Sequence, residues 1–230
     1  MSYRKDMDVP PPWGLGGECL VGMVRHRSAS DLPCGLARVP GLSLVVGARY
    51  DRSPVGPYLE LAVGEPARSG VRVGMCVTTM VVTTADARHA GRSKWGMPKV
   101  LGDLTWDNDG ETRVLRWDER GLVLRATPVG PPLPILVPFR SLQRRGDGLV
   151  SATASLRGLA RLARVDVEVA EIDPLAWLEG RHVGAVVGSA RLAMGEASLL
   201  SGLRTPRWSQ RPAPDPALLS GPSTGRLAQR

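Results

Sequence analysis

The hydrophobic pattern of the chain consists of short apolar runs, each bounded by glycine, proline, asparagine or aspartate. Runs of this kind, rich in Val and Leu, predict β-strands. Residues 165–169 give the clearest case, because valine at every second position alternates with Asp166 and Glu168, the period of a half-buried strand. Strands are predicted at Glu18 to His26, Leu42 to Tyr50, Val71 to Val82, Arg113 to Trp117, Leu122 to Thr127, Leu149 to Leu156, Leu162 to Ala170 and Val183 to Ala193.

Turn residues between these runs indicate how the strands pair. Asn108 to Gly110 and Asp118 to Gly121 contain residues that tolerate positive φ in hairpin turns, so the strands beside them are predicted to pair antiparallel. Helical signals are few: Thr84 to Gly91 and Asp173 to Gly180 each begin with a capping residue and end at a glycine. The predicted fold is mainly β, an antiparallel closed or cone-like β-barrel with two or three short helices, because closure removes exposed strand edges.

Length and composition favour one folded domain. A chain of 230 residues with 43% hydrophobic content can build a single sizeable core, predicted here to span residues 1–204. Residues 205–230 are rich in Pro, Gly and Ser with little to bury, which predicts a disordered tail. No run of 18 or more apolar residues occurs, and the first twelve residues are polar and proline-rich, so we expect a soluble, cytoplasmic protein without a membrane partner.

The ionisable residues and cysteines narrow the possible chemistry. A net charge of +8 could attract nucleic acid, but the arginines are scattered among acidic residues and show no basic-aromatic pattern, so no nucleic-acid partner is predicted. Three cysteines without metal-ligand spacing predict buried thiols rather than a disulfide or metal site. Only Lys5, Lys94 and Lys99 are lysines, and arginine is not deprotonated in proteins, so amine chemistry is limited to these three and the N-terminus.

Two segments carry a specific pattern: Ser-Pro-Val-Gly-Pro-Tyr-Leu-Glu-Leu at residues 53–61, and Gly-Arg-Ser-Lys-Trp-Gly-Met-Pro-Lys at residues 91–99. Together they resemble the acetoacetate decarboxylase superfamily. The resemblance extends over roughly residues 10–197 and includes Pro-Pro-Trp at 11–13 and Met-Gly-Glu-Ala at 194–197. It identifies the chain as a divergent member with an acetoacetate decarboxylase-like fold, and assembly into a homo-oligomer is expected from the resemblance alone.

The resemblance implies a site built around Lys99. In that family the lysine after the proline forms a Schiff base with a β-keto acid, and the glutamate of the Tyr-x-Glu segment, here Glu60, lies in the same pocket. No cofactor and no metal are implied. Four other side chains of the two segments are candidates for substrate binding: Tyr58, Arg92, Trp95 and Met97.

Lysine chemistry of this kind makes a physical demand on the protein. An amine attacks a carbonyl only when neutral, and a free lysine, with a pKa of ~10.4, is neutral in only about one molecule in 2,500 at pH 7. A nucleophilic lysine therefore needs surroundings that disfavour its ammonium form. The function implied is a Schiff-base-forming, lyase-type enzyme that acts on a small keto acid, by decarboxylation or by an aldol or dehydration step through the same imine.

Departures from the better-known decarboxylases favour an alternative, a non-catalytic small-molecule-binding protein that keeps the fold. Those enzymes carry a second lysine after the nucleophile, where this chain has Val100. Their further carboxylate is missing from Leu44 to Arg49, and their arginine near the first strand falls around Gly17. Three site residues also have a purely structural interpretation. In these readings Lys99 is a surface residue, Glu60 pairs with an arginine, and Arg92 complements the helix dipole or covers Trp95.

Overall fold

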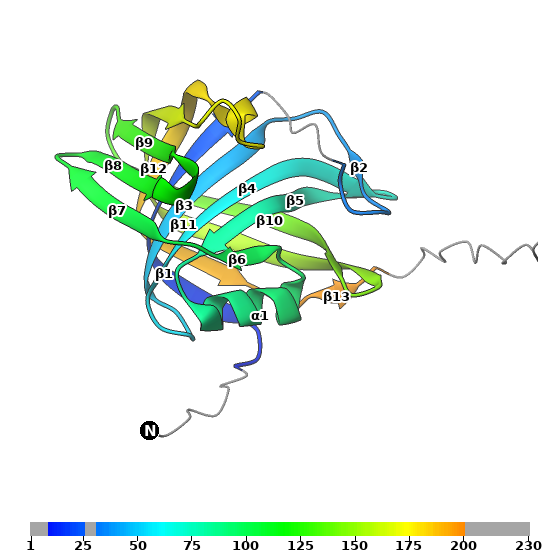
Figure 1. Cartoon of the computed structure of the whole chain (residues 1–230). Coiled ribbons are helices and arrows are strands. Elements are labelled where there is room, and N and C mark those ends of the chain that lie inside the picture. Colours follow the sequence, from blue (N-terminus) through cyan, green and yellow to red (C-terminus); the bar gives the residue numbers. More distant parts are fainter. Residues whose placement is uncertain (1–8, 26–30, 201–230) are drawn as a thin grey trace, which may run out of the picture. The chain divides into compact units, whose positions relative to one another are not determined.

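The computed structural model describes residues 9–25 and 31–200, which belong to one compact unit, Met1–Leu200 (Figure 1). The predicted tail at 205–230 lies outside the described residues. The elements are the strands β1 (Trp13–Val24), β2 (Ala37–Arg38), β3 (Ser43–Arg52), β4 (Tyr58–Ser69), β5 (Arg72–Val82), β6 (Lys99–Leu101), β7 (Leu104–Asp109), β8 (Thr112–Trp117), β9 (Leu122–Pro128), β10 (Leu133–Arg145), β11 (Gly148–Glu168), β12 (Gly180–Met194) and β13 (Ser198–Leu199), and the helix α1 (Ala85–Trp95).

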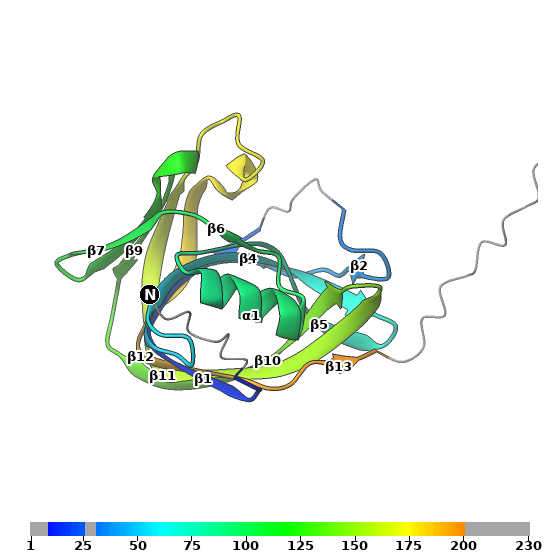
Figure 2. The same cartoon turned by 60° about the horizontal axis from the view of Figure 1, so that its bottom comes forward.

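The sheet curves round until its pairing returns to the starting strand. Neighbouring strands follow the order β10-β5-β4-β3-β1-β12-β11, and β11 pairs again with β10. Closure between β10 and β5 rests on one parallel pair, Ser141 with Met75. The strands β9, β8 and β7 continue from the other part of β11. The fold prediction is therefore confirmed as mainly β and cone-like, and α1 lies across the opening of the curved sheet (Figure 2).

Both faces of the central strands are buried, in two separate cores. Along β4, Tyr58 and Ala62 point to a core that also contains residues of α1, which we call the helix-side core. Leu61 and Val63 point to the opposite core, which is shared with β8 and β9. Successive side chains of a strand point to opposite faces, so residue 60, like residues 58 and 62, points into the helix-side core. Glu60 is one of them.

The helix prediction was right about the start of α1 and wrong about its end. Thr84 has an extended backbone, and its hydroxyl accepts a hydrogen bond from the backbone N–H of Ala87 at 3.4 Å, as expected of an N-cap. Gly91 does not end the helix, which continues to Trp95. The second predicted helix, at 173–180, is only a 3₁₀ turn at Ala176–Leu178 within the described residues.

The strand predictions also needed corrections, since β4 was not among the predicted strands and two further regions differ. The runs at 149–156 and 162–170 form one strand, β11, whose 21 residues pair with β12 and β13 on one side and with β10 and β9 on the other. The strand β10 was not predicted. Its Pro134 and Pro138 are typical strand breakers, and its first residues are largely exposed, so it lacks an alternating pattern. Long-range pairing with β11 therefore decides its conformation.

The structure also shows how exposed each cysteine is and whether any helix could span a membrane. Cys19 and Cys76 are buried, and burial raises the pKa of each thiol to about 12. Cys34 is exposed, so the prediction of buried thiols holds for only two of the three. Within residues 9–25 and 31–200, no helix has the length and hydropathy required to cross a bilayer.

Candidate active site

The end of α1 determines where Lys99 lies. Gly96 adopts a left-handed conformation with φ of 68°, and its N–H donates to the carbonyl of Arg92, while the N–H of Met97 donates to the carbonyl of Gly91. With the left-handed Gly96, the bond from Gly96 to Arg92 is that of an αL C-cap motif, a common way to satisfy the last carbonyls of a helix. Pro98 cannot continue the helix. The Gly-Met-Pro segment therefore ends α1 and begins β6 at Lys99.

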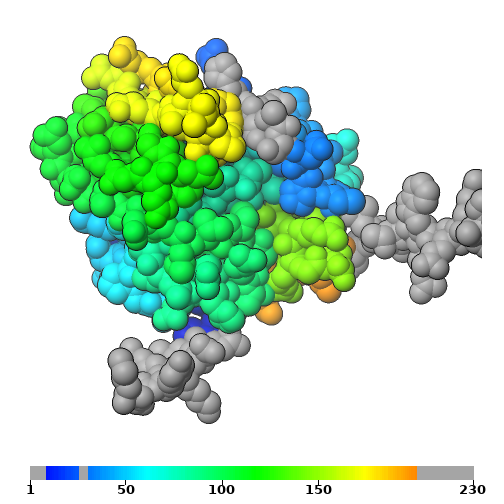
Figure 3. Space-filling model, viewed as in Figure 1, coloured from blue at the N-terminus to red at the C-terminus, as the bar shows by residue number. Residues whose placement is uncertain are grey.

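Helix and strand then hold the Lys99 side chain between them. Lys99 pairs in register with Met80 of β5, and its Cδ and Cε atoms lie so close to Gly91 that a Cβ there would be 2.5 and 2.6 Å away. Only a residue without a side chain allows this approach. Lys99 is 6% exposed, so the simpler reading of a surface lysine is wrong. In the space-filling view, residues of α1 and the segment that follows it form the lower middle of the visible surface (Figure 3).

Glu60 reaches Lys99 from β4, which is separated from β6 by β5. It pairs with Val82 of β5, one position diagonal to the Met80–Lys99 pair, on the same face of the sheet. Its Oε2 lies 2.8 Å from Nζ of Lys99, and the residue is 7% exposed. The carboxylate is thus paired to a lysine and not, as the simpler reading had it, to an arginine. Two buried opposite charges of this kind are tolerated because they neutralise each other.

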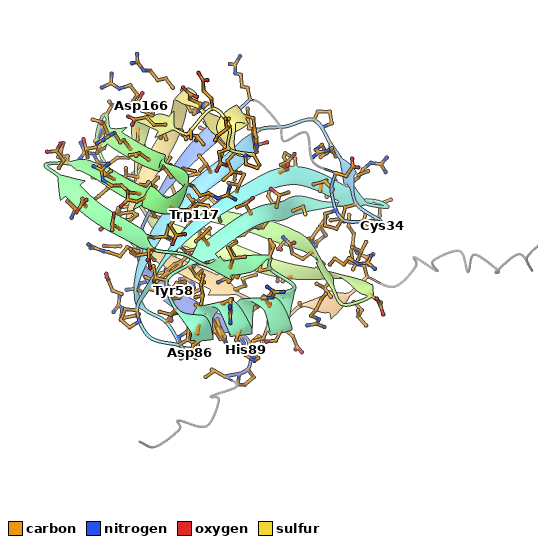
Figure 4. All side chains as sticks on the ribbon, in the orientation of Figure 1. Cys34, Tyr58, Asp86, His89, Trp117 and Asp166 are labelled. Atoms are coloured by element: carbon orange, nitrogen blue, oxygen red, sulfur yellow. The ribbon has the colours of Figure 1, made fainter. Side chains whose placement is uncertain are left out.

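Two tyrosines complete the polar surroundings of this pair. Nζ of Lys99 lies 5.2 Å from the ring centroid of Tyr58, within the range of a cation–π contact. The hydroxyl of Tyr50 donates to Oε1 of Glu60 at 3.5 Å. Burial, and secondarily the Glu60 carboxylate, raise the pKa of both tyrosines, so both remain neutral. Tyr58 lies above the helix, whose Asp86 and His89 point away from the sheet (Figure 4).

The remaining candidates lie around this group without touching the amine. Nη1 of Arg92 donates to the backbone carbonyl of Lys99 at 3.4 Å, so its guanidinium stabilises the start of β6. Trp95 donates from Nε1 to the carbonyl of Gly195 at 2.8 Å and packs edge-on against Trp13. Met97 is buried in the helix-side core. Substrate contact by these three residues stays a prediction.

Comparison with known proteins decides the family. A family model described as Acetoacetate decarboxylase (ADC) matches residues 4–198. The chain belongs to this family. A search among curated proteins found no match.

Solved structures of family members share the fold at low sequence identity. Acetoacetate decarboxylase from Legionella pneumophila aligns with a TM-score of 0.62 at 14% identity, covering 83% of this chain and 88% of the other. The enduracididine biosynthesis enzyme MppR, complexed with pyruvate, gives 0.63 at 17% identity, with coverages of 85% and 92%. An acetoacetate decarboxylase-like enzyme from Sphingomonas wittichii RW1 gives 0.62 at 16%, with coverages of 85% and 96%. At these identities the likeness establishes the fold.

The departures from better-known acetoacetate decarboxylases can now be placed in the structure. Val100 follows Lys99 on β6, so its side chain points to the opposite face, and it is 45% exposed. The position of the second lysine therefore does not face Glu60 in this family member. At Gly17 the backbone of Arg49 lies against the glycine, which leaves no room for an arginine side chain. In the part of the chain that the structure describes, no cluster of His, Cys, Asp or Glu side chains could hold a metal ion.

Sequence reasoning missed two residues of the group. Gly91 was interpreted as a helix end, although a glycine inside a helical pattern costs about 1 kcal/mol relative to alanine and commonly marks a close approach. Tyr50 gave no signal, because its contact with Glu60 arises only when β3 pairs with β4.

Gly91→Ala is expected to slow the reaction of the Lys99 amine with a ketone without unfolding the helix. The new Cβ would displace the Lys99 side chain from Glu60, while alanine favours the helix by about 1 kcal/mol. We expect the rate of Schiff-base formation to fall about 10- to 100-fold, since misplacement by about 1 Å can cost 10²-fold. Rapid quenching with borohydride measures that rate. Gly188→Ala is the control, because its Cβ would meet nothing nearer than 3.9 Å, and equal rates in the two variants would contradict the assignment.

Proposed function

We propose that this protein is a Schiff-base-forming, lyase-type enzyme acting on a small keto acid, with Lys99 as nucleophile and Glu60 as proton acceptor and donor. The observation that carries the proposal is the buried contact of 2.8 Å between Nζ of Lys99 and Oε2 of Glu60. The contact lies in a core of apolar and aromatic side chains, where displacing water strengthens electrostatic interactions.

The first stage makes the imine. One proton moves from the Lys99 ammonium to the Glu60 carboxylate, which leaves a neutral amine beside a carboxylic acid. The amine nitrogen bonds to the ketone carbon of the substrate. The former carbonyl oxygen then takes one proton from that nitrogen and one from Glu60, and leaves as water. The products are a protonated imine on Lys99 and an ionised Glu60, so protons and charge balance.

The second stage uses the imine as an electron acceptor. With a β-keto acid, the bond to the carboxylate carbon breaks, carbon dioxide leaves and the electron pair forms a neutral enamine. With an α-keto acid such as pyruvate, Glu60 removes a proton from the carbon beside the imine and the same type of enamine forms. That enamine can add to an aldehyde. Protonation of the enamine, or its addition to the aldehyde, gives an imine again. Hydrolysis of that imine releases the product and regenerates Lys99.

The family and its members support this range of reactions. The chain belongs to the acetoacetate decarboxylase family over residues 4–198, and one member of similar fold, MppR, was solved with pyruvate and with the condensation product of pyruvate and imidazole 4-carboxaldehyde. Both keto-acid classes are therefore candidate substrates. The Lys99–Glu60 pair can run either branch, because Glu60 takes a proton from Lys99 and gives it to the departing water in both, and the carboxylate so restored removes a substrate proton in the α-keto acid branch.

Borohydride trapping tests the proposal. Wild-type protein is incubated with acetoacetate or pyruvate, reduced, digested and analysed by mass spectrometry, and we expect the added mass on the peptide containing Lys99. Lys94 is an internal control, because it lies only two residues before the Gly-Met-Pro turn and is more exposed than Lys99. Modification of Lys94 and Lys99 in proportion to exposure, or an unmodified Lys99 across a panel of keto acids, would refute an imine mechanism.

The competing function is ligand binding without turnover, which the outward-facing Val100 favours. In that case keto acids would raise the melting temperature of wild type and Lys99→Ala equally, because no covalent bond contributes. A shift seen only in the wild type supports the enzyme.

A further inference from the structure

Three arginines lie in one row across four adjacent strands, far in sequence from the Lys99 segment. Arg157 of β11 pairs directly with Arg191 of β12, Arg191 pairs with Gly16 of β1, and Gly16 pairs with Arg52 of β3. Directly opposed residues of neighbouring strands point to the same face of a sheet. The sheet therefore gathers three positive charges on one surface, with a glycine between the second and third.

The row faces away from the proposed catalytic pair. Leu15 and Leu192, which flank Gly16 and Arg191 in sequence, pack in or against the helix-side core. Adjacent residues of a strand point to opposite faces, so the arginines lie on the other side of the sheet from Lys99. All three arginines are exposed.

A groove lies over this row. Its volume is about 530 Å³, and it is lined by the three arginines together with small or apolar residues of β1 and β12: Gly14, Leu15, Gly16, Leu192 and Ala193. The guanidinium of Arg52 leans over β1, because a Cβ on Gly16 would lie 3.2 Å from its Nε and 3.3 Å from its Nη2. Gly16 thus gives the Arg52 head group the space to approach Arg191.

These arginines also differ from most others in having no acidic partner. Arginines on β2, β3, β8, β9, β11 and β12 form ion pairs with carboxylates, for example Arg49 with Glu18 at 2.7 Å and Arg161 with Glu111. Within the described ranges 9–25 and 31–200, no ion pair or hydrogen bond is made by the Arg52, Arg157 or Arg191 side chains, and no carboxylate lines the groove. Like charges placed directly opposite each other destabilise a sheet.

We infer that this groove binds a small organic polyanion, one that carries at least two phosphoryl or carboxylate groups. Each guanidinium offers a planar fork of donors that fits such a group with two parallel hydrogen bonds. Strands lie about 4.8 Å apart, so Arg191 and Arg52, on either side of β1, can engage groups separated by up to about 10 Å. Between the arginines the groove is floored by the strand backbone with Gly14, Gly16 and Ala193, whose small size leaves room for the carbon skeleton. The site is independent of the Schiff-base chemistry and needs no substrate of that reaction.

Calorimetric titration in phosphate-free, low-salt buffer tests the inference, with pyrophosphate and citrate as separate probes for the two anion types. We expect at least one of them to bind with a stoichiometry of one. Arg157→Gln/Arg191→Gln should weaken that binding at least tenfold. The control Arg68→Gln/Arg72→Gln removes the same charge from exposed positions outside the groove and should change affinity less than twofold.

A second readout concerns the protein without ligand. Arg191→Gln should raise the melting temperature by about 1–2 °C, because it removes the repulsion with Arg157, and it should reduce the stabilisation by the bound probe. Failure of both probes to bind, or equal weakening in the groove and control variants, would overturn the inference. So would tighter binding of an oligonucleotide with steep salt dependence, or loss of a dimer in the groove variant, because each assigns the arginines to a macromolecular partner.

Discussion

Lys99→Arg is expected to abolish Schiff-base chemistry while leaving the fold in place. Arginine keeps a positive charge that can pair with Glu60, but it is not deprotonated in a protein and so cannot attack a ketone. We expect loss of the borohydride-trapped adduct and a fall of at least about 1,000-fold in rate, since the whole covalent pathway is removed. Exchange of the hydrogens beside the ketone in deuterated water, followed by NMR, measures enamine formation whichever product the enzyme makes.

The matched control is Lys94→Arg. Lys94 lies on α1 and makes the same chemical change possible at a position where no role in the reaction is proposed. It should exchange the substrate hydrogens at the wild-type rate. Near-wild-type exchange by Lys99→Arg, or equal losses in both variants, would show that the Lys99 amine is not the nucleophile.

The second large effect concerns stability. Replacing either Glu60 or Lys99 by methionine leaves the other charge buried in the helix-side core, and such single truncations cost about 3–5 kcal/mol of the free energy of unfolding. The double variant Glu60→Met/Lys99→Met removes both charges and keeps the side-chain volume. It should lie within about 1 kcal/mol of the wild type or exceed it. Urea denaturation of the four proteins measures this cycle.

An exposed ion pair is the reference for that cycle. Arg125 and Glu168 lie 3.6 Å apart on β9 and β11, with side chains 36% and 63% exposed. Solvent screens such a pair, so its double-mutant cycle should give about 0–1 kcal/mol. A coupling energy at the Lys99 pair no larger than this would mean that water reaches both charges. The proposed site would then not be enclosed.

The contact between Lys99 and Glu60 has different consequences for the stability of the protein and for the reactivity of the amine. Nζ of Lys99 and Oε2 of Glu60 lie 2.8 Å apart, and in the proposed reaction a proton must leave that nitrogen before the amine can attack a ketone. The position after Lys99 holds an outward-facing valine, so the structure supplies no second lysine there to favour the neutral amine. In the proposed mechanism, activity therefore depends on proton transfer to Glu60.

Local sequence signals predicted several features because their causes lie within a few residues. Thr84 caps α1 through a backbone group three residues away, and the Asn-Asp-Gly turn joins β7 to β8 as expected. The motif at residues 91–99 indicated the family and the lysine, and the family model confirms the first of these. Assembly into a homo-oligomer and a keto-acid substrate stay predictions.

By itself, the sequence determined the class of fold, the family and the short list of amines available for chemistry, since apolar periodicity, turn residues and one motif are all local properties. Only the tertiary structure gave the direct 2.8 Å contact between Glu60 and Lys99 across 39 positions of sequence, gave Gly91 its role and aligned Arg157, Arg191 and Arg52 in one row. The physical reason is strand register. Which side chains meet across a sheet depends on pairings between distant segments, and a shift of one residue would send each of them to the opposite face.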